Sequence, residues 1–446
     1  MKFKTLLATK ASLTLLMKTL SAALWMAGVF VTASPSSAQN PIVPMGTYIA
    51  DPSSRAMPDG RLYVYGSTDL TPDKYCSKEY HVLSTADLKQ WTMHRNSFSW
   101  GETLYAPDVM LRDGTYYLYY DVPDGSEYVA VGDSPSGPFR DGVKIEGPRQ
   151  IDPNIFIDDD GQAYYFWGQF SAKGARMNPD MKTLDLSSVV DGLVTEKEHH
   201  FHEGSYVIKR GKYYYYIYAD ISRRGRPTSL GYAMATSPLG PYEYKGVIID
   251  NHGCDPASWN NHGSIVEYRG QWYVLYHRST HNCRSMRKAC IEPIRFNADG
   301  TIDEVEMTSQ GASGPLDAFV RNDAARACLM GGKVYICRTA EDASREELGN
   351  IHAGDWAAWK YMDFGRGARG VSLRVKSEAG GTIVLHSDSL CGRELERIEV
   401  PAHMGWTEWR AKVKRVRGVH ALVMEFQGAQ TDEELFCIDT FAFMRR

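Results

Sequence analysis

Short apolar runs rich in tyrosine alternate with glycine-containing turns over the first two thirds of the chain. An apolar run, a turn and an aromatic run together form the pattern of a β-hairpin. Five copies of the glycine-led aromatic run occur, at Gly60–Gly66, Gly114–Tyr120, Gly161–Trp167, Gly211–Ile217 and Gly270–Tyr276. Their first glycines recur about every 50 residues, which predicts the four-stranded blades of a β-propeller.

An ionisable or polar residue precedes each copy at a similar spacing. These residues are Asp51, Asp108, Asp152, Glu203 and His262. In a closed ring of blades, equivalent positions converge on the central axis, so we expect these side chains at one mouth of the channel. Unpaired buried carboxylates are costly, and a protein core has no need of them.

Three of these carboxylates, Asp51, Asp152 and Glu203, are the candidate catalytic residues. Glycoside hydrolysis needs one carboxylic acid to protonate the leaving oxygen and one carboxylate to activate water or attack the sugar. A third carboxylate nearby would raise the pKa of the acid by repulsion between like charges. The alternative for each residue alone is an ordinary turn position, because Asp-Pro and Glu-Gly pairs are common in turns.

Composition narrows the range of partners. The 446-residue chain has a net charge of −4, which argues against a polyanion partner such as a nucleic acid, and it contains 27 tyrosines and 10 tryptophans. Aromatic side chains at this frequency are typical of proteins that bind sugars. Trp100 and Tyr105 are candidates for stacking on a sugar face, with packing in the core as the alternative.

The N-terminus has the features of a secretory signal peptide over residues 1–38. Four lysines lie within the first 18 residues, Leu20–Val31 is apolar, and small residues end at Ala38. An uncleaved anchor is the alternative, but this apolar run is shorter than the ~20 residues that a membrane span needs. We therefore expect a secreted or periplasmic protein without a membrane span after signal removal.

Eight cysteines are compatible with either disulfides or buried thiols. Export would permit disulfides, and Cys283 with Cys290 or Cys328 with Cys337 are close enough in sequence to pair locally. Buried free thiols are the equal alternative.

The domain organisation follows from a change of pattern after residue 312. Residues 39–312 hold the five repeats, and a small-residue linker follows at Gln310–Pro315. Residues 318–446 contain several short alternating strands, which predict a β-sandwich. The chain is therefore expected to be all-β, with a five-bladed propeller followed by a sandwich. Basic residues between Arg410 and Arg417 are interpreted as a solvated strand face.

The ordered motifs of residues 41–310 resemble glycoside hydrolase family 43. The motifs are Ala50–Pro52, Tyr105–Asp108, Ile151–Pro153, His202–Gly204 and His262–Ser264. The resemblance implies a five-bladed propeller and an inverting arabinofuranosidase, xylosidase or arabinanase. It also implies that Asp51 is the general base, that Asp152 modulates the pKa of the acid and orients it, and that Glu203 is the general acid.

The resemblance suggests further roles around the carboxylates. His262 matches an axial histidine that in many members helps to hold a hydrated cation, usually calcium; a histidine that only donates or accepts hydrogen bonds is the alternative. Arg278 matches an arginine that reaches toward the sugar and the base. Asp108 and His202 are further expected substrate-binding residues.

Residues 318–446 resemble carbohydrate-binding modules of family 6. Gly354–Trp356, Gly405–Trp409 and Leu435–Phe441 carry the resemblance. Such modules use aromatic residues and a polar residue near the last strand, where asparagine is common. Because Cys437 stands at that place, we expect xylan or arabinoxylan to bind this domain weakly or not at all.

The expected function is hydrolysis of terminal α-L-arabinofuranosyl residues from arabinose- or xylose-containing plant glycans. A β-xylosidase or β-galactofuranosidase is the alternative within the same family. A glycan-binding propeller without catalysis is the alternative from another class. The presence of all three carboxylates argues against that last reading, because binding alone does not need them.

Overall fold

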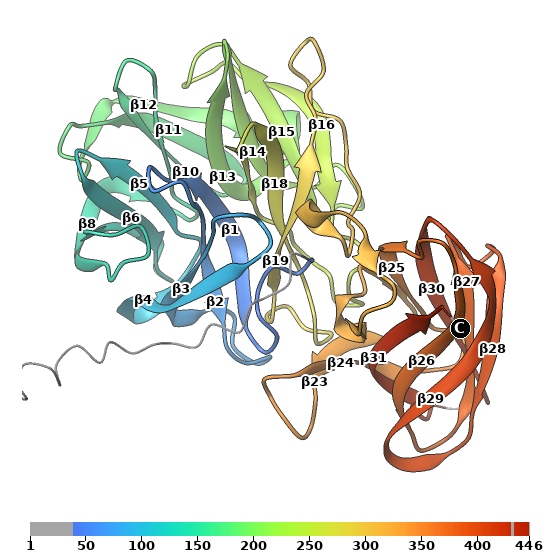
Figure 1. Cartoon of the computed structure of the whole chain (residues 1–446). Coiled ribbons are helices and arrows are strands. Elements are labelled where there is room, and N and C mark those ends of the chain that lie inside the picture. The colour runs from blue at the N-terminus through green and yellow to red at the C-terminus, as the bar shows by residue number, and fades with distance from the viewer. Residues whose placement is uncertain (1–38, 430–431, 446) are drawn as a thin grey trace, which may run out of the picture. The chain divides into compact units, whose positions relative to one another are not determined.

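The computed structural model describes residues 39–429 and 432–445, and almost all regular structure in these ranges is β-strand (Figure 1). The one α-helix among them is the four-residue α2 (Glu196–His199). The predicted signal peptide covers residues 1–38 and lies outside the described residues. Within the described ranges, no helix has the length and apolar character needed to cross a membrane.

The region before residue 300 forms five antiparallel sheets in which sequence neighbours pair. The sheets contain β1 (Tyr48–Ala56), β2 (Leu62–Asp69), β3 (Ser77–Thr85) and β4 (Trp91–Leu104); β5 (Asp108–Arg112), β6 (Thr115–Asp121), β7 (Ser126–Gly132) and β8 (Arg140–Arg149); β9 (Asn154–Ile157), β10 (Ala163–Trp167), β11 (Ser171–Met177) and β12 (Leu184–Thr195); β13 (Phe201–Arg210), β14 (Tyr213–Asp220), β15 (Ser229–Ala235) and β16 (Glu243–Asp250); and β17 (Ser264–Tyr268), β18 (Gln271–Arg278) and β19 (Lys288–Ile294). Each glycine-led aromatic repeat forms the second strand of one sheet, as the hairpin pattern predicts.

Neighbouring sheets pack face to face through the apolar side chains of these strands. Tyr215 and Ile217 of β14, for example, share a cluster with Val274 of β18. The first and last sheets also share a cluster, in which Val64 of β2 lies with Leu275 of β18. A closed propeller requires such a contact between its first and last sheets. The number of blades stays a prediction.

The C-terminal region contains two six-stranded sheets, consistent with the expected β-sandwich. One sheet has β20 (Leu316–Asp317), β25 (Trp356–Asp363), β30 (Val419–Gln427), β27 (Gly381–Ser387) and β28 (Glu394–Val400), with β22 (Leu329–Gly331) beside β25. The other has β23 (Tyr335–Arg338), β24 (Glu346–Ile351), β31 (Phe436–Met444), β26 (Ala368–Ser377) and β29 (His403–Val416), with β21 (Asn322–Asp323) beside β31. One cluster of buried side chains from both sheets forms the core.

All eight cysteines lie in described residues, and each is a free thiol. Neither local pair that the sequence suggested is bonded, so the alternative of free thiols describes the structure. Cys290 is buried in the core shared by the fourth and fifth sheets.

Candidate active site

The backbone around the first two carboxylates is unusual. Asp51 has φ +52° and Asp152 has φ +59°, although neither is glycine and each precedes a proline. Positive φ at such residues costs on the order of 1–3 kcal/mol, and such residues cluster at functional sites. At Asp51 the pairing of β1 with β2 shifts register between Ala50 and Ser53. This local break in the ladder allows the carboxylate to depart from the regular alternation of the strand.

One pocket of about 210 Å³ brings together the three predicted catalytic carboxylates. Its wall also contains two further residues that the sequence singled out, Tyr105 and His262. The remaining lining residues are Tyr75, Ala106, Ile151, Gln169 and Trp259. The convergence of Asp51, Asp152 and Glu203 from three different sheets agrees with the expectation from their matched spacing.

Asp51 is held as a carboxylate by a buried guanidinium. Arg287 Nη1 donates to Asp51 Oδ1 at 2.9 Å, and Ser67 Oγ donates to Oδ2 at 2.6 Å. Burial, the largest single effect, raises the pKa of Asp51, but Arg287, the two nearby histidines and the Ser67 hydrogen bond together outweigh it, and the net pKa lies below its usual value. An ionised Asp51 beside the pocket is suited to accept a proton from water.

Asp152 lies between other acidic groups. Its Oδ2 accepts a hydrogen bond from the Gly204 N–H at 2.8 Å, and its own N–H donates to Asp121 Oδ1 at 3.3 Å. Burial first, and then the negative charges of Glu203, Asp121 and Asp51, raise the pKa of Asp152 well above its usual value. Ionisation of Asp152 is therefore disfavoured by its surroundings.

Glu203 lies at the start of β13, where the pairing with β14 is irregular on both sides of it. Gln169 Nε2 donates to Glu203 Oε2 at 2.9 Å, and His202 Nε2 lies 3.9 Å from the same oxygen. The ring of His202 also packs edge-on against Phe170. His202 thus borders the carboxylate of Glu203 from outside the lining of the pocket.

His262 places one imidazole at the pocket wall, with Nδ1 3.7 Å from Asp51 Oδ1. Burial lowers the pKa of His262, so its ring is neutral near pH 7 and has a free nitrogen lone pair to offer. The described residues contain no group of three or more His, Cys, Asp or Glu side chains placed to hold a metal ion. A cation here would depend on His262 and on water for its remaining ligands.

Asp108, an expected substrate-binding residue, lies outside the pocket lining. Asp108 lies within β5 itself and is almost completely buried, where it pairs with Arg55 and accepts from Ser53 Oγ at 2.6 Å and Asn154 Nδ2 at 2.7 Å. It ties neighbouring sheets together and does not line the pocket. Its shorter distance to the turn glycine, six residues rather than nine, is the sequence signal for this difference.

Trp100 also lies outside the pocket lining. It belongs to β4, the last strand of its sheet, and its ring packs near Phe98, Tyr120 and Tyr128, with the ring centroids 5.5–6.1 Å apart. The alternative of core packing therefore applies to Trp100. Tyr105, in contrast, lines the pocket as expected.

The arginine beside Asp51 is Arg287, not the expected Arg278. Arg278 is buried away from the pocket, where Nη2 donates to Tyr276 Oη at 2.7 Å and to the Thr308 carbonyl at 2.6 Å. Arg278 pairs with Lys288 in the β18–β19 ladder, and Arg287 immediately precedes Lys288 in the chain. Because side chains of successive residues alternate between faces of a sheet, this single step selects the opposite side.

Sequence reasoning also missed three side chains of the pocket, namely Tyr75, Gln169 and Trp259. Tyr75 lies 5.9 Å from the ring of Trp259 and 6.3 Å from the ring of Tyr105. Together these rings form an aromatic wall of the pocket, and Tyr75 Oη accepts from the same Arg287 Nη1 that contacts Asp51. Tyr75 and Trp259 come from connections between strands and have no counterpart in the repeat, so no periodic signal marked them.

Three carboxylates gathered in a small aromatic-walled pocket form the kind of site that glycoside hydrolases use. The comparisons with known proteins agree. Residues 38–302 match the family described as glycosyl hydrolases family 43, and the chain belongs to this family. Residues 324–445 match the carbohydrate-binding module of family 6.

The chain resembles curated relatives along most of its length. It is 31% identical to a xylosidase/arabinosidase of Thermoclostridium stercorarium, over 87% of this chain and 96% of the relative. It is 28% identical to an arabinoxylan arabinofuranohydrolase of Bacillus subtilis, over 87% of this chain and 89% of the relative. A β-xylosidase of Xylanibacter ruminicola is 29% identical, over 58% of this chain and 97% of the relative.

Solved structures give the same result. A family 43 arabinoxylan arabinofuranohydrolase from Bacillus subtilis, in complex with cellotetraose, has a TM-score of 0.53 at 26% identity and covers 92% of this chain and 99% of its own. A family 43 β-xylosidase/α-arabinofuranosidase from a compost metagenome, in complex with xylotriose and in a calcium-free form, has a TM-score of 0.54 at 28% identity. It covers 61% of this chain and 98% of its own.

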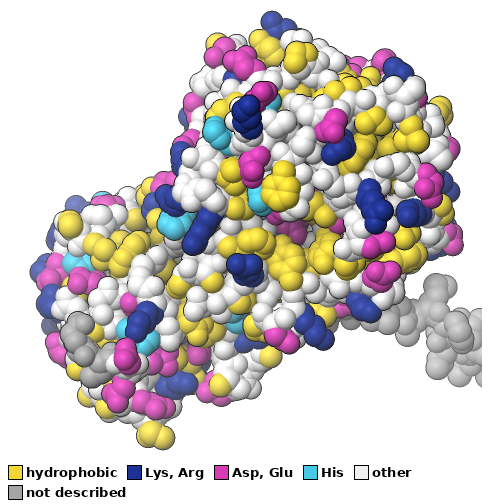
Figure 2. All heavy atoms as spheres, turned by 180° about the vertical axis from the view of Figure 1, so that it is seen from behind, with side chains coloured by type: hydrophobic (Ala, Val, Ile, Leu, Met, Phe, Trp, Pro, Cys, Tyr) yellow, Lys and Arg dark blue, Asp and Glu magenta, His cyan; other side chains and the backbone are white. Residues whose placement is uncertain are grey.

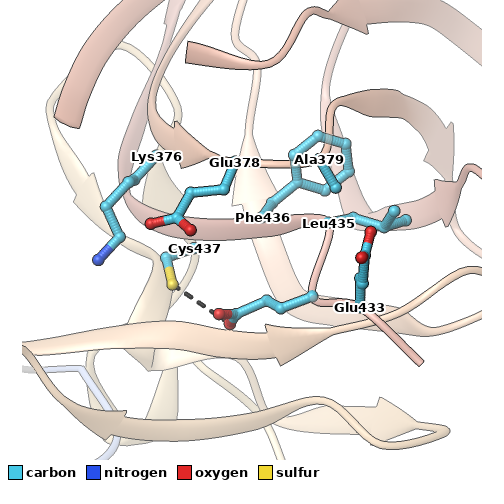
Figure 3. Close-up of a pocket in the computed structure, with 8 residues that line it drawn as sticks. Lys376, Glu378, Ala379, Glu433, Leu435, Phe436 and Cys437 are labelled. Carbon is cyan, nitrogen blue, oxygen red and sulfur yellow. Dashed lines mark hydrogen bonds between the residues drawn. The ribbon is translucent and has the colours of Figure 1, made fainter. Parts of the chain in front are cut away.

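A second pocket, of about 470 Å³, lies on the sandwich around Cys437 (Figure 3). Cys437 Sγ donates to Glu434 Oε1 at 3.3 Å, and burial raises the pKa of its thiol. The charged side chains of this pocket are Lys376, Glu378, Glu433 and Glu434. Its one aromatic lining residue, Phe436, is buried in the core.

Proposed function

We propose that this enzyme is a secreted, inverting exo-glycosidase that removes terminal α-L-arabinofuranosyl residues from arabinoxylan-type plant glycans. The observation that carries the proposal is the pocket of about 210 Å³ that holds Asp51, Asp152 and Glu203. Sites for drug-sized ligands are about 300–1,000 Å³, so this pocket has room for a single sugar unit. A one-sugar pocket with an acid and a base is suited to release of a terminal residue.

The ionised Asp51 activates the attacking water, while Glu203 donates a proton to the departing oxygen. Asp152, fixed by the Gly204 N–H, sets the charge around the acid. The aromatic wall of Tyr75, Tyr105 and Trp259 packs on the sugar ring and excludes bulk water. In this scheme one carboxylate acts as the base, one as the acid, and the third acts through its charge.

The choice of arabinofuranosyl substrates draws support from a relative that matches both domains. The arabinoxylan arabinofuranohydrolase of Bacillus subtilis resembles both the propeller and the sandwich, over 87% of this chain. The β-xylosidase of Xylanibacter ruminicola covers 58% of it. β-Xylosidase activity is the second candidate, because the same three carboxylates can serve both sugars.

The test is a comparison of initial rates on three nitrophenyl glycosides, the α-L-arabinofuranoside, the β-D-xylopyranoside and the β-D-galactofuranoside, followed by arabinoxylan. The arabinofuranoside should be hydrolysed fastest, with free arabinose as the product from the polymer. An Asp51→Asn/Glu203→Gln variant is the matched control and should be inactive on all substrates. Faster turnover of the xylopyranoside would favour the second candidate, and no turnover at all would favour a glycan-binding propeller.

Export is part of the same proposal and rests on the basic and apolar pattern of residues 1–38. The exported protein should begin at or near Gln39. N-terminal sequencing of the protein recovered from the medium or periplasm tests this, and retention of Met1 in the exported protein would contradict it.

A further inference from the structure

A groove of about 590 Å³ lies on the sandwich, on the outer face of the sheet that contains β26, β29 and β31. Leu373 and Trp409 of this sheet pack toward the core. Since side chains alternate along a strand, their neighbours Arg374 and Glu408, which pair across the two strands, face outward. The groove is lined by Arg321, Ser372, Arg374, Trp406, Glu408 and Arg410, among others.

The floor of the groove carries an excess of positive charge. The buried carboxylate of Asp439 accepts from Arg374 Nη1 at 2.7 Å, from Arg345 Nη2 at 2.7 Å and from Arg321 Nη2 at 3.3 Å. One carboxylate cannot neutralise three guanidinium groups. The side chain of Arg321 is 61% exposed, so its remaining donors reach the groove.

Arg410 adds a further exposed cation at the opposite wall. Its Nη2 lies 3.3 Å from Glu408 Oε1, and its side chain is 68% exposed. The groove therefore presents more guanidinium groups than carboxylates to any ligand. Arginine recognises carboxylates well because its planar fork can donate two parallel hydrogen bonds.

Trp406 supplies an apolar surface beside these cations. The guanidinium carbon of Arg374 lies 5.3 Å and Lys376 Nζ lies 5.6 Å from the centroid of its ring. An aromatic ring next to arginines is suited to a ligand that has both an apolar face and a negative charge. A sugar acid has these two features in one ring.

We propose that this groove binds a hexuronic acid side group of a plant glycan, and thereby recruits the enzyme to acidic xylans. This inference goes beyond the proposed hydrolysis and does not depend on which sugar the propeller removes. It also fits the expectation that uncharged xylan binds the sandwich weakly, because the specific contact is made by the carboxylate.

The surroundings favour a single carboxylate over a long polyanion. The pocket around Cys437 shares the same sheet, and Glu378 lines it together with Glu433 and Glu434 (Figure 3). Acidic and basic side chains are also interspersed over the face shown in Figure 2, and the whole chain has a net charge of −4. A polyanion that extended from the groove into the pocket around Cys437 would meet these glutamates, whereas a lone uronate contacts only the arginines.

The test uses the full-length chain and two matched polymers in affinity electrophoresis or titration calorimetry. One is xylan with glucuronic acid side groups, and the other is the same xylan after reduction of its carboxyl groups to alcohols. We expect the reduced polymer to bind at least tenfold more weakly. Equal binding of both polymers, binding of neither, or equally tight binding of dextran sulfate would overturn the proposal.

Variants then locate the site. Arg321→Gln/Arg410→Gln and, separately, Trp406→Ala should each weaken binding of the acidic xylan about tenfold. Arg393→Gln/Arg397→Gln removes two charges from exposed positions at β28, in the other sheet, and should leave binding unchanged. A similar loss in the control, or no loss in the groove variants, would contradict the proposal. Hydrolysis of a nitrophenyl glycoside should stay unchanged in all of them, which separates this test from that of the proposed function.

Discussion

The buried carboxyl of Asp121 accepts a hydrogen bond from the main-chain N–H of Asp152, at 3.3 Å. The N–H of Asp51 is held in the same way by His277 Nδ1, at 3.2 Å. Both acceptors lie near the end of the second strand of the preceding sheet, and both N–H groups belong to residues with positive φ. Side chains from one sheet thus stabilise the strained backbone that presents a carboxylate from the next.

Asp121 should weaken the folded state as the pH rises. Burial, and then the charges of Asp51 and Glu203, raise the pKa of Asp121 well above its usual value. A carboxyl with a raised pKa contributes stability that is present below its unfolded pKa of about 3.9 and is lost as pH rises through the folded pKa. Asp121→Asn keeps an oxygen acceptor for the Asp152 N–H but cannot ionise.

The measurement is the melting temperature of wild type and Asp121→Asn at pH 5 and pH 8. From pH 5 to pH 8, the melting temperature of the variant should rise relative to that of the wild type. The expected rise is about 2–4 °C for each kcal/mol that ionisation of Asp121 costs the wild-type fold. Asp133→Asn, at an exposed carboxyl, is the matched control and should show a constant difference. A difference for Asp121→Asn that is the same at both pH values would rule out this role.

Replacement of Arg287 should shift the acidic limb of the pH–rate profile. The guanidinium is the largest of the effects that lower the pKa of Asp51 against burial, so Arg287→Gln should raise that pKa. Because Asp51 acts as a base only when ionised, the limb of kcat/KM should move to higher pH. Loss of one partner of a buried ion pair also costs about 3–5 kcal/mol, so rates are measured well below the melting temperature.

Arg278→Gln is the control for this prediction. Arg278 is buried like Arg287, but it contacts Tyr276 and the Thr308 carbonyl instead of Asp51. The Arg278→Gln variant should be less stable than the wild type, while the acidic limb of its pH–rate profile should not move. Arg287→Lys keeps the positive charge and should lie between wild type and Arg287→Gln. The same shift in both glutamine variants would contradict a specific role for Arg287.

The repeated strands could be predicted from the sequence because their signals are local. A turn glycine followed by alternating aromatic residues specifies a hairpin without reference to the rest of the chain. The similar spacing of eight or nine residues between a turn glycine and an acidic residue also located Asp51, Asp152 and Glu203. Position relative to a repeated strand is information that a single sequence contains.

The remaining site residues depend on how separate segments pack. Tyr75 and Trp259 reach the pocket from irregular connections, whose paths no short pattern specifies. Arg278 and Arg287 are both basic residues next to the β18–β19 hairpin, and only the register decides which one meets Asp51. The choice between the two arginines failed because a shift of one position exchanges the two faces of a sheet.

The stereochemical outcome follows from the proposed base. If Asp51 activates a water instead of attacking the sugar, the carboxyls of Asp51 and Glu203 should be separated by roughly 6.5–9.5 Å to leave room for that water. A proton NMR time course on a nitrophenyl arabinofuranoside should then show the inverted anomer of arabinose first. Initial appearance of the retained anomer would identify a double displacement and remove the role of Asp51 as a base.

The response to chelation tests the role of His262. If its neutral imidazole helps to hold a hydrated calcium ion, exhaustive chelation should lower the activity or the melting temperature, and added calcium should restore it. His262→Ala should then abolish the response to calcium, whereas His420→Ala, at a partly exposed position of the sandwich, should retain it. An unchanged melting temperature and activity after chelation would leave His262 as a histidine that only lines the pocket.

The assignment of acid and base can be separated by the leaving group. Glu203 is proposed to protonate the departing oxygen, which a sugar alcohol needs and a nitrophenolate does not. Glu203→Gln should therefore lose far more rate on an arabinoxylan oligosaccharide than on a nitrophenyl glycoside. Assistance by a general acid or base is typically worth about 10²–10⁴-fold, so the contrast is measurable.

Asp51→Asn provides the reciprocal result. Water must be activated whatever group departs, so this variant should lose a comparable rate on both substrates. Gln169→Ala removes the side chain that donates to Glu203 at 2.9 Å and should show a weaker form of the Glu203→Gln pattern. The two roles would have to be exchanged if Glu203→Gln slowed both substrates equally while Asp51→Asn depended on the leaving group.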